Sequence, residues 1–303
     1  MAAASNSVRR ARPLLGTFVE IEAAGSFQPD VLSAVEAAFE AVSTVHQLMS
    51  FHDPDSDVGR LNREAHVRPV PVHALTFEVL EAALEMNRRS NGIFDVAVAP
   101  GLQAAGILPK TGRDVSLTAE PGATDAIMLL EGNVVGFRDA GVRIDLGGIA
   151  KGFAVDRALS ILRERGVVNA IVNAGGDLAC FGEETRTVCI RHPRDPGRIV
   201  CQIQLVDAAL ATTARRFDPF HSTETARPAI IDPRATVAAC ANDGATVRAA
   251  SCMIADALTK VVMIAGTGAT ELIEQYSASA LLIGSDRGLQ ITPDWQHAVH
   301  LAA

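Results

Sequence analysis

Hydrophobic and polar residues recur along the chain in patterns that predict both strands and helices. Apolar and acidic residues alternate at the end of residues 14–22, which predicts a strand with one face in a core. After Asp30, apolar residues recur every three or four positions, which predicts a helix that Asp30 caps and that runs to about residue 50. Residues 51–57 are acidic and contain Pro54. They therefore predict a turn at the surface or over a ligand, because a helix does not continue through that proline.

The later segments alternate between helix and strand patterns without an internal repeat. A second helix is expected over residues 75–90, ending where Gly92 can adopt a left-handed conformation. Further helices are expected at residues 149–165, 251–265 and 268–276. Strands are expected at residues 126–131, 134–138, 142–146, 170–173, 177–181, 187–191, 199–206, 229–232, 245–249, 279–283 and 288–291. The three strands between 177 and 206 suggest an antiparallel meander, and residues 214–229 resemble a loop. This mixture favours an α+β fold over a regular βαβ repeat.

Composition narrows the class of protein. The 303 residues are 48% hydrophobic and 20% charged, as in a globular chain that buries a sizeable core. The net charge of -8 leaves no basic surface for a nucleic-acid backbone, so that class is excluded. We find neither a run of about 18 apolar residues nor a leader pattern, and we expect a cytoplasmic location without a transmembrane segment. The five cysteines lack C-x-x-C spacing, which argues against a disulfide scaffold or a zinc site.

The strongest chemical motif is residues 144–156. A predicted strand carries Asp145 and then Gly147-Gly148 to the start of a helix, where unpaired backbone N–H groups can hold a phosphate. Lys151 adds a cation beside them. The alternative is a glycine turn that only lets the helix pack on a sheet. The motif is neither a P-loop nor a G-x-G-x-x-G fingerprint.

Three weaker motifs gain meaning together. Asn173–Asp177 can be a tight hairpin or part of a site, and Gly92–Asp95 places an aromatic ring and a carboxylate after a helix stop. Asp256 stands near the start of a predicted helix, where an oxygen ligand three or four positions later would share its face. Such a pair suits a hard cation such as magnesium. The alternative is that Asp256 has no ligand and stands there because the helix dipole favours an acidic residue near the N-terminus.

In this order the motifs resemble the signatures of the ApbE family of FAD:protein FMN transferases, from about residue 13 to 266. The matching segments are Leu14–Thr17, Met49-Ser50 with Asp53–Ser56 and Asn62, Gly92–Asp95, Ile144–Asp156, Asn173–Asp177, Ile231–Arg234 and Ala255–Leu258. The resemblance implies an α+β fold of mixed, largely antiparallel sheets with packed helices, in two tightly joined lobes with an FAD cleft between them. We expect residues 1–12 to be a flexible N-terminus and residues 13–303 to form one domain.

The resemblance also implies an activity and a site. The activity is magnesium-dependent transfer of FMN from FAD, through a phosphoester bond, to a Thr or Ser of a flavin-acceptor protein, with release of AMP. The residues expected to contact FAD are Leu15, His52, Ile93, Phe94, Asp95, Asp145, Lys151 and Ile231. The residues expected to hold Mg²⁺ are Gly148, through its carbonyl, with Asp256 and Thr259. Asp256 and Lys151 are the expected catalytic residues.

The chain departs from the family pattern at several positions. Ala229 stands where the family has a His that resembles the base for the acceptor hydroxyl, and His221 is a candidate substitute. Lys260 stands where the family has a Thr four residues after the metal aspartate, so its ammonium group could pair with Asp256 in place of a cation. Arg215 and Arg216 follow Thr213-Ala214 and could either bind phosphate or be solvated.

These departures leave three functions open. The first is FMN transfer to a protein hydroxyl. The second is an FAD pyrophosphatase, which would use water as the acceptor and yield FMN and AMP. The third is a non-catalytic FAD-binding protein in which Lys260 replaces the metal.

Overall fold

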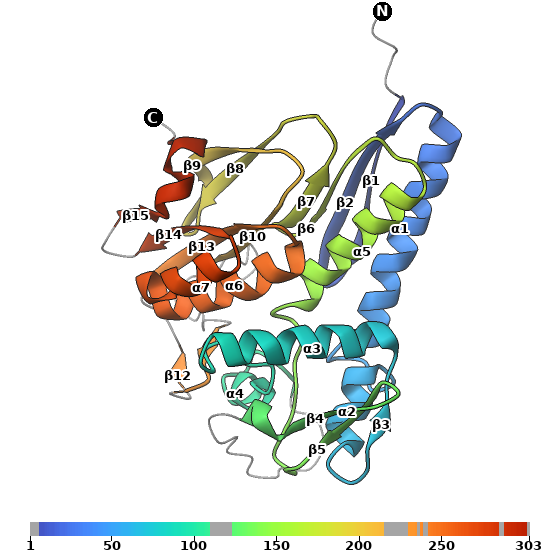
Figure 1. Cartoon of the computed structure of the whole chain (residues 1–303), viewed down its shortest axis with the longest axis vertical. Coiled ribbons are helices and arrows are strands. Elements are labelled where there is room, and N and C mark those ends of the chain that lie inside the picture. The colour runs from blue at the N-terminus through green and yellow to red at the C-terminus, as the bar shows by residue number, and fades with distance from the viewer. Residues whose placement is uncertain are drawn as a thin grey trace, which may run out of the picture.

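An eight-stranded antiparallel sheet forms the centre of the protein (Figure 1). The computed structural model describes residues 6–109, 123–214, 230–234, 237–238, 242–284 and 288–301. In sheet order the strands are β1 (Asn6–Leu14), β2 (Thr17–Gly25), β6 (Asn169–Ala174), β7 (Asp177–Phe181), β10 (Ala209–Ala214), β13 (Asn242–Ala249), β14 (Ser279–Gly284) and β15 (Gly288–Ile291). Every neighbouring pair is antiparallel.

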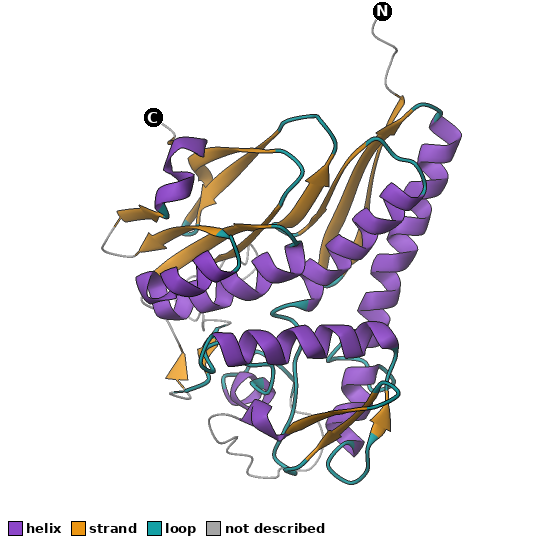
Figure 2. Ribbon diagram, viewed as in Figure 1, coloured by secondary structure: helices purple, strands orange, loops and turns teal. Residues whose placement is uncertain are grey.

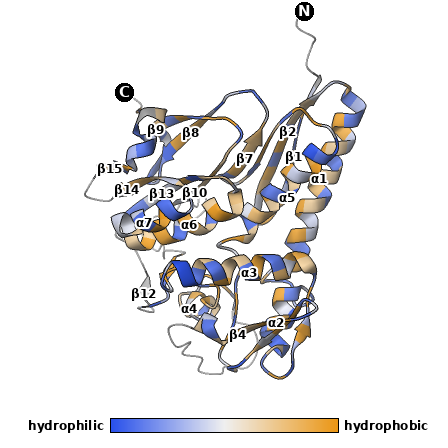
Figure 3. Ribbon diagram, viewed as in Figure 1, coloured by the Kyte–Doolittle hydropathy of each residue, from blue (hydrophilic) through white to orange (hydrophobic). Residues whose placement is uncertain are grey.

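Three long helices pack beside this sheet (Figure 1): α1 (Gln28–Met49), α5 (Ala150–Glu164) and α6 (Cys252–Ala265). Hydrophobic and hydrophilic positions alternate along the ribbon of α1 in Figure 3, as in a helix with one face in a core, whereas α6 has no exposed residue. The contact between α5 and α6 depends on Gly152. A Cβ atom at this position would lie 2.2 Å from the carbonyl oxygen of Cys252, so only glycine lets the two helices approach this closely.

A second group of elements lies below α5 and α6 in the view of Figure 1. Its helices are α2 (Asp57–Glu64), α3 (Ala74–Arg89), α4 (Ala99–Ala104) and the 3-10 helix η1 (Ala123–Ala126). A three-stranded sheet in the order β3 (Val70–Pro71), β5 (Val134–Phe137), β4 (Ile127–Leu130) completes it. Asp57 joins α2 to α3, because its carboxylate accepts hydrogen bonds from the His73 amide (2.8 Å) and the Thr76 hydroxyl (2.7 Å).

A smaller core is formed by residues from the second half of the chain. A three-stranded sheet in the order β16 (Val299–Leu301), β9 (Asp195–Leu205), β8 (Arg186–His192) packs over it, and Trp295 is fully buried in it. The remaining elements are η3 (Gly266–Ala269), α7 (Thr270–Gln275), η4 (Pro293–Ala298), β11 (Ile231–Asp232) and β12 (Val237–Ala238).

The α+β class with antiparallel sheets and packed helices is confirmed, and Figure 2 shows both element types throughout the chain. The meander expected between residues 177 and 206 is wrong. β7 pairs with β6 and β10 in the large sheet, whereas β8 and β9 pair in a separate one. The expected strand at 142–146 is also absent, and that segment is instead held by a side chain, as described below.

Other differences concern the ends of elements. Residues 6–12, which the sequence analysis assigned to a flexible N-terminus, pair with β2 as strand β1. Helix α1 begins two residues before Asp30, so Asp30 lies in its first turn and Phe27 is the N-cap. Helices α2 and α4 and strands β3, β10, β12 and β16 were not predicted. The expected stop of α3 is confirmed, with Gly92 at a φ of 76°.

The helical segment Cys252–Gln275 is apolar and long enough to cross a membrane by these two criteria alone. In the fold, 56% of its most apolar window is buried, and α6 packs against α5, β10 and β13. A core helix satisfies the same criteria. The expected absence of a transmembrane segment and the cytoplasmic location stay predictions.

Candidate functional site

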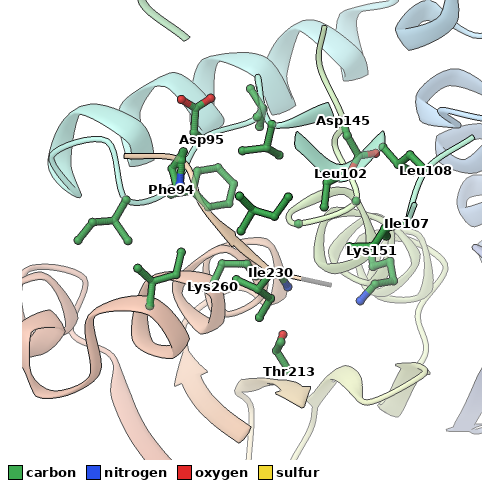
Figure 4. A pocket seen from close by; sticks show the side chains of 18 of the residues that line it. Phe94, Asp95, Leu102, Ile107, Leu108, Asp145, Lys151, Thr213, Ile230 and Lys260 are labelled. Carbon is green, nitrogen blue, oxygen red and sulfur yellow. The ribbon is translucent and has the colours of Figure 1, made fainter. Parts of the chain in front are cut away.

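A pocket of about 380 Å³ is lined by residues from α4, α5, α6, β10, β11 and the loops after α3 and before α5 (Figure 4). One part of its lining is apolar: Ile93, Phe94, Leu102, Ile107, Leu108 and Ile231. Another part is polar: Asp145, Gly147, Gly148, Lys151, Thr213 and Lys260. Figure 4 shows Lys151 and Lys260 with their ammonium groups on the Thr213 side of the pocket. The pocket thus offers an apolar wall and two cations to one ligand.

The loop after α3 presents Phe94 to the pocket. Asn91 and Gly92 both have positive φ angles, 51° and 76°, which turn the chain sharply at the helix end. The buried Asn87 side chain donates to the Phe94 carbonyl (2.7 Å), and the Phe94 amide donates to the Ser90 hydroxyl (3.0 Å). These bonds fix the backbone on both sides of the aromatic ring.

Asp95 lies next in this loop, and its carboxylate is occupied within the protein. Its Oδ1 accepts hydrogen bonds from the Ala97 amide (2.6 Å) and from the Thr124 hydroxyl. Burial raises the pKa of Asp95, and these bonds oppose the rise only in part. The carboxylate therefore holds the pocket wall together and also borders the pocket.

The segment that carries Asp145 is anchored by a side chain rather than by a strand. The Asn62 amide group donates to the Ile144 carbonyl (2.9 Å) and accepts from the Ile144 amide (2.7 Å), as a neighbouring strand would. The Asp145 amide donates to the Val96 carbonyl (2.8 Å), which joins this segment to the Phe94 loop. Burial raises the pKa of Asp145, while the Gly147 amide, His52 and Lys260 act in the opposite direction.

Lys151 projects from the first turn of α5 and forms an ion pair with Asp177. Asp177 begins β7 directly after the tight turn at Gly175 and Gly176, whose φ angles are 67° and 103°. The segment Asn173–Asp177 is therefore a hairpin and also supplies a partner for Lys151. Burial lowers the pKa of Lys151, but the carboxylates of Asp256 and Asp177 outweigh it and raise the value, so this lysine is charged.

Asp256, on α6, is fully buried, and both of its carboxylate oxygens are engaged. Oδ1 pairs with the Lys260 ammonium group, and Oδ2 accepts from the Gly152 amide (3.1 Å). Burial raises the pKa of Asp256, but Lys151 and Lys260 outweigh it and hold the value below its usual range. Asp256 is thus an anion that bridges α5 and α6 beneath the pocket.

Thr259 is also fully buried and engaged. Its hydroxyl donates to the Asp256 carbonyl (2.7 Å) and shares a hydrogen bond of 2.7 Å with the Thr213 hydroxyl. A hydroxyl carries one hydrogen, so Thr213 is the donor in that pair. In the ranges that the structure describes, no three His, Cys, Asp or Glu side chains form a metal-binding cluster. The donor set around Asp256 does not fit a resident Mg²⁺ ion, which needs several free oxygen ligands.

The structure brings most of the predicted flavin contacts to one pocket. The lining includes Ile93, Phe94, Asp95, Asp145, Lys151 and Ile231, together with Gly148. Leu15 and His52 do not line it: Leu15 lies in the β1–β2 turn with a φ of 56°, and His52 is exposed after α1. Ala229, His221, Arg215 and Arg216 lie outside the described residues.

Two parts of the lining were missed by sequence reasoning. Leu102, Ile107 and Leu108 come from α4 and the turn after it, where the apolar run at 96–108 is the available signal. Thr212 and Thr213 come from the end of β10, and the signal available for them is the place of Thr213-Ala214 in a segment that departs from the family pattern.

Comparisons with known proteins agree with one another. The family model described as the ApbE family matches residues 15–282. The chain is 30% identical over 236 residues to the FAD:protein FMN transferase of Vibrio cholerae serotype O1, covering 73% of this chain and 70% of that protein. It is 27% identical over 254 residues to the FAD:protein FMN transferase of Treponema pallidum, covering 74% and 69%.

Solved structures share the fold. The crystal structure of the ApbE protein from Thermotoga maritima superimposes with a TM-score of 0.84 at 25% identity, covering 96% of this chain and 99% of that one. The flavin transferase ApbE from Vibrio cholerae gives a TM-score of 0.77 at 24% identity, covering 95% and 96%. With a family match over most of its length and this common fold, the chain belongs to the ApbE family.

Proposed function

We propose that this chain binds FAD in the pocket and transfers its FMN part to a Thr or Ser hydroxyl of a flavin-acceptor protein. The single observation that supports this most is the mixed lining, which combines apolar side chains such as Phe94 and Ile231 with two ammonium groups, those of Lys151 and Lys260. FAD needs both, since it combines planar rings with a diphosphate. In this proposal the large sheet with its helices is one lobe, the α2–α4 region is the other, and FAD lies between them.

The transfer would proceed as follows. The acceptor oxygen attacks the phosphorus of the FMN half, and the bond from that phosphorus to the bridging oxygen breaks. AMP leaves with the bridging oxygen, and the hydroxyl proton passes to solvent water, because Ala229 stands where the family has its expected base. Lys151 and Lys260 would stabilise the negative charge that develops on the leaving phosphate, because cations held in place before the reaction favour its transition state.

The proposal assigns no step to Mg²⁺. Of the three residues expected to bind it, Asp256 and Thr259 have oxygens engaged with Lys260, Gly152 and Thr213, and the role of the Gly148 carbonyl stays a prediction. A magnesium requirement, if measured, would have to come from ions that arrive with the nucleotide.

Incubation of the purified chain with FAD and a flavin-acceptor domain tests the proposal. We expect a mass increase on the acceptor equal to that of FMN, together with AMP in equal amount. The Vibrio cholerae relative serves as the positive control. An acceptor that this control modifies and this chain leaves unmodified would contradict the transferase assignment.

A second candidate is an FAD pyrophosphatase. Ala229, at the position of the family's expected base, favours it, because the residue that would activate a protein hydroxyl is missing there. Release of FMN and AMP in the absence of any acceptor protein would identify this activity. FAD that stays bound and intact under both conditions would instead identify a non-catalytic FAD-binding protein.

A further inference from the structure

We infer that Lys260 is a built-in counter-ion for the ligand's diphosphate, so that the pocket binds FAD without a divalent cation. This inference rests on the proposed function for the identity of the ligand. It goes beyond that function because it names Lys260 as the cation that pairs with the diphosphate. It also predicts that FAD affinity does not depend on Mg²⁺.

The position of Lys260 is fixed by its helix. It lies one turn after Asp256 on α6, and its ammonium group bonds to the Asp256 carboxylate and also to the Asp256 carbonyl (3.1 Å). The Lys260 side chain is 18% exposed, while Asp256 is fully buried beneath it. The ion pair with Asp256 therefore holds the Lys260 ammonium group at the pocket surface.

The surroundings leave a metal ion little to bind. A Mg²⁺ ion on Asp256 would have to share the carboxylate with the Lys260 ammonium group and the Gly152 amide, which occupy one position on each oxygen. The ion would then lie beside the Lys260 ammonium group, and the two positive charges would repel each other. The Thr259 hydroxyl donates its hydrogen to the Asp256 carbonyl and accepts a hydrogen bond from Thr213. One lone pair of its oxygen is left for a metal ion.

Gly148 supports the same assignment. A Cβ atom at this position would lie 3.6 Å from Lys260 Cε and 3.6 Å from Phe94 Cε2. The lysine stem, the glycine and the aromatic ring are therefore neighbours on the pocket wall. A ligand whose ring packs near Phe94 would bring its phosphates towards the ammonium group at the end of that stem.

Lys151 supplies the second charge. It is anchored by the fully buried Asp177, as Lys260 is by Asp256, and its side chain is 32% exposed. Each ammonium group thus has a buried carboxylate behind it and the pocket before it. Two such groups match the two negative charges of a diphosphate without help from an added ion.

Equilibrium titration of the wild-type chain with FAD, followed by flavin fluorescence, tests the inference in buffer with EDTA and in buffer with millimolar Mg²⁺. We expect the two dissociation constants to agree within about twofold, since no metal joins the complex. Lys260→Thr should weaken binding at least about tenfold in EDTA and should regain affinity when Mg²⁺ is added, because an uncovered carboxylate and a new hydroxyl can hold the ion.

Two matched variants complete the design. Lys260→Arg keeps a cation on Asp256 and should bind FAD in EDTA within a few-fold of the wild type. Arg165→Met removes a positive charge from the exposed end of α5 and should leave the affinity unchanged in both buffers. Thermal melting of each variant establishes that it is folded.

The outcomes separate this inference from the proposed function. Wild-type binding that is more than about tenfold tighter in Mg²⁺ than in EDTA would overturn the inference and leave FAD binding intact. Unchanged affinity of Lys260→Thr in EDTA would overturn it as well. Absence of FAD binding in both buffers would instead overturn the proposed function, and the inference with it. If Lys260→Thr does not fold, the wild-type comparison still decides.

Discussion

Lys151 on α5 pairs with Asp177, the first residue of β7, which is 26 positions further along the chain. The pair joins the helix after the Gly147-Gly148 turn to the hairpin that follows Gly175-Gly176. Asp177 Oδ1 is buried and has no hydrogen-bond partner within the described part of the protein, so Lys151 is the principal partner of this carboxylate. The stability of the fold and the charge of the pocket therefore depend on the same lysine.

Lys151→Met should affect both properties. It leaves Asp177 as an unpaired buried charge, which should lower the free energy of unfolding by about 3–5 kcal/mol. It should also weaken FAD binding, because one of the two pocket cations is lost. Urea denaturation and flavin titration measure the two effects separately.

The double variant Lys151→Met with Asp177→Asn separates the effect on stability from the effect on FAD binding. Neutralising the carboxyl group should restore most of the lost stability, since no buried charge is left unpaired. FAD affinity should stay low. Wild-type affinity in this double variant would mean that Lys151 does not contact the ligand.

Gly152→Ala should destabilise the contact between α5 and α6. The added Cβ would lie 2.2 Å from the Cys252 carbonyl, and the helices would have to separate at a cost of about 1–3 kcal/mol or more. Gly268→Ala is the matched control, because its Cβ would lie 3.9 Å from the Ala265 Cβ, an ordinary contact. Urea midpoints should fall for the first variant and change little for the second; equal midpoints would contradict the close packing at Gly152.

Asn62→Leu should release the segment that carries Asp145. The Ile144 amide and carbonyl would both lose their partner, at about 1–3 kcal/mol for each buried group left unpaired. We expect FAD affinity to fall as well, because Asn62 positions the Gly147-Gly148 turn. Thr76→Val is the control: it breaks the buried bond to Asp57 and should reduce stability while leaving affinity unchanged. Equal affinities for both variants would show that Asn62 is only structural.

The carboxyl group of Asp156 predicts a pH dependence of stability. Burial raises its pKa to about 6, although the Met253 and Cys252 amides favour the ionised form. Between its ordinary pKa of about 3.9 and this value, the folded protein binds more protons than the unfolded chain. The contribution of Asp156 to stability is therefore full below about pH 4 and is lost as the pH rises through about 6.

Comparison of the wild type with Asp156→Asn measures this contribution. The free energy of unfolding of both proteins is measured from pH 4 to pH 7. Relative to Asp156→Asn, the wild type should become less stable as the pH rises. A difference that does not vary with pH would contradict the raised pKa.

Local signals in the sequence were sufficient for part of this structure. The glycine after α3 marks the helix end because a left-handed residue is needed there, and Gly92 has a positive φ as expected. The helix after Gly147-Gly148 is likewise marked by its apolar spacing. These features depend on neighbouring residues, so a local pattern can reveal them.

Contacts between residues far apart in the sequence could not be predicted from local patterns. Asn62 bonds to a backbone segment 82 positions away, and its amide replaces the strand that was expected to pair with residues 142–146. The pairing of β7 with β10, rather than with β8, is set by packing of the whole sheet. The partner of Lys151 could not be predicted for the same reason. The pairing of Lys260 with Asp256 was anticipated because both residues lie on one helix, four positions apart.

Titration of the purified chain with FAD, with ADP as a competitor, tests the central claim most directly. The account predicts saturable one-to-one binding that ADP displaces, because the diphosphate meets Lys151 and Lys260, and that Ile231→Asp weakens, because a charge enters the apolar wall. Absence of binding, or binding that neither ADP nor Ile231→Asp affects, would contradict the claim that this pocket holds FAD.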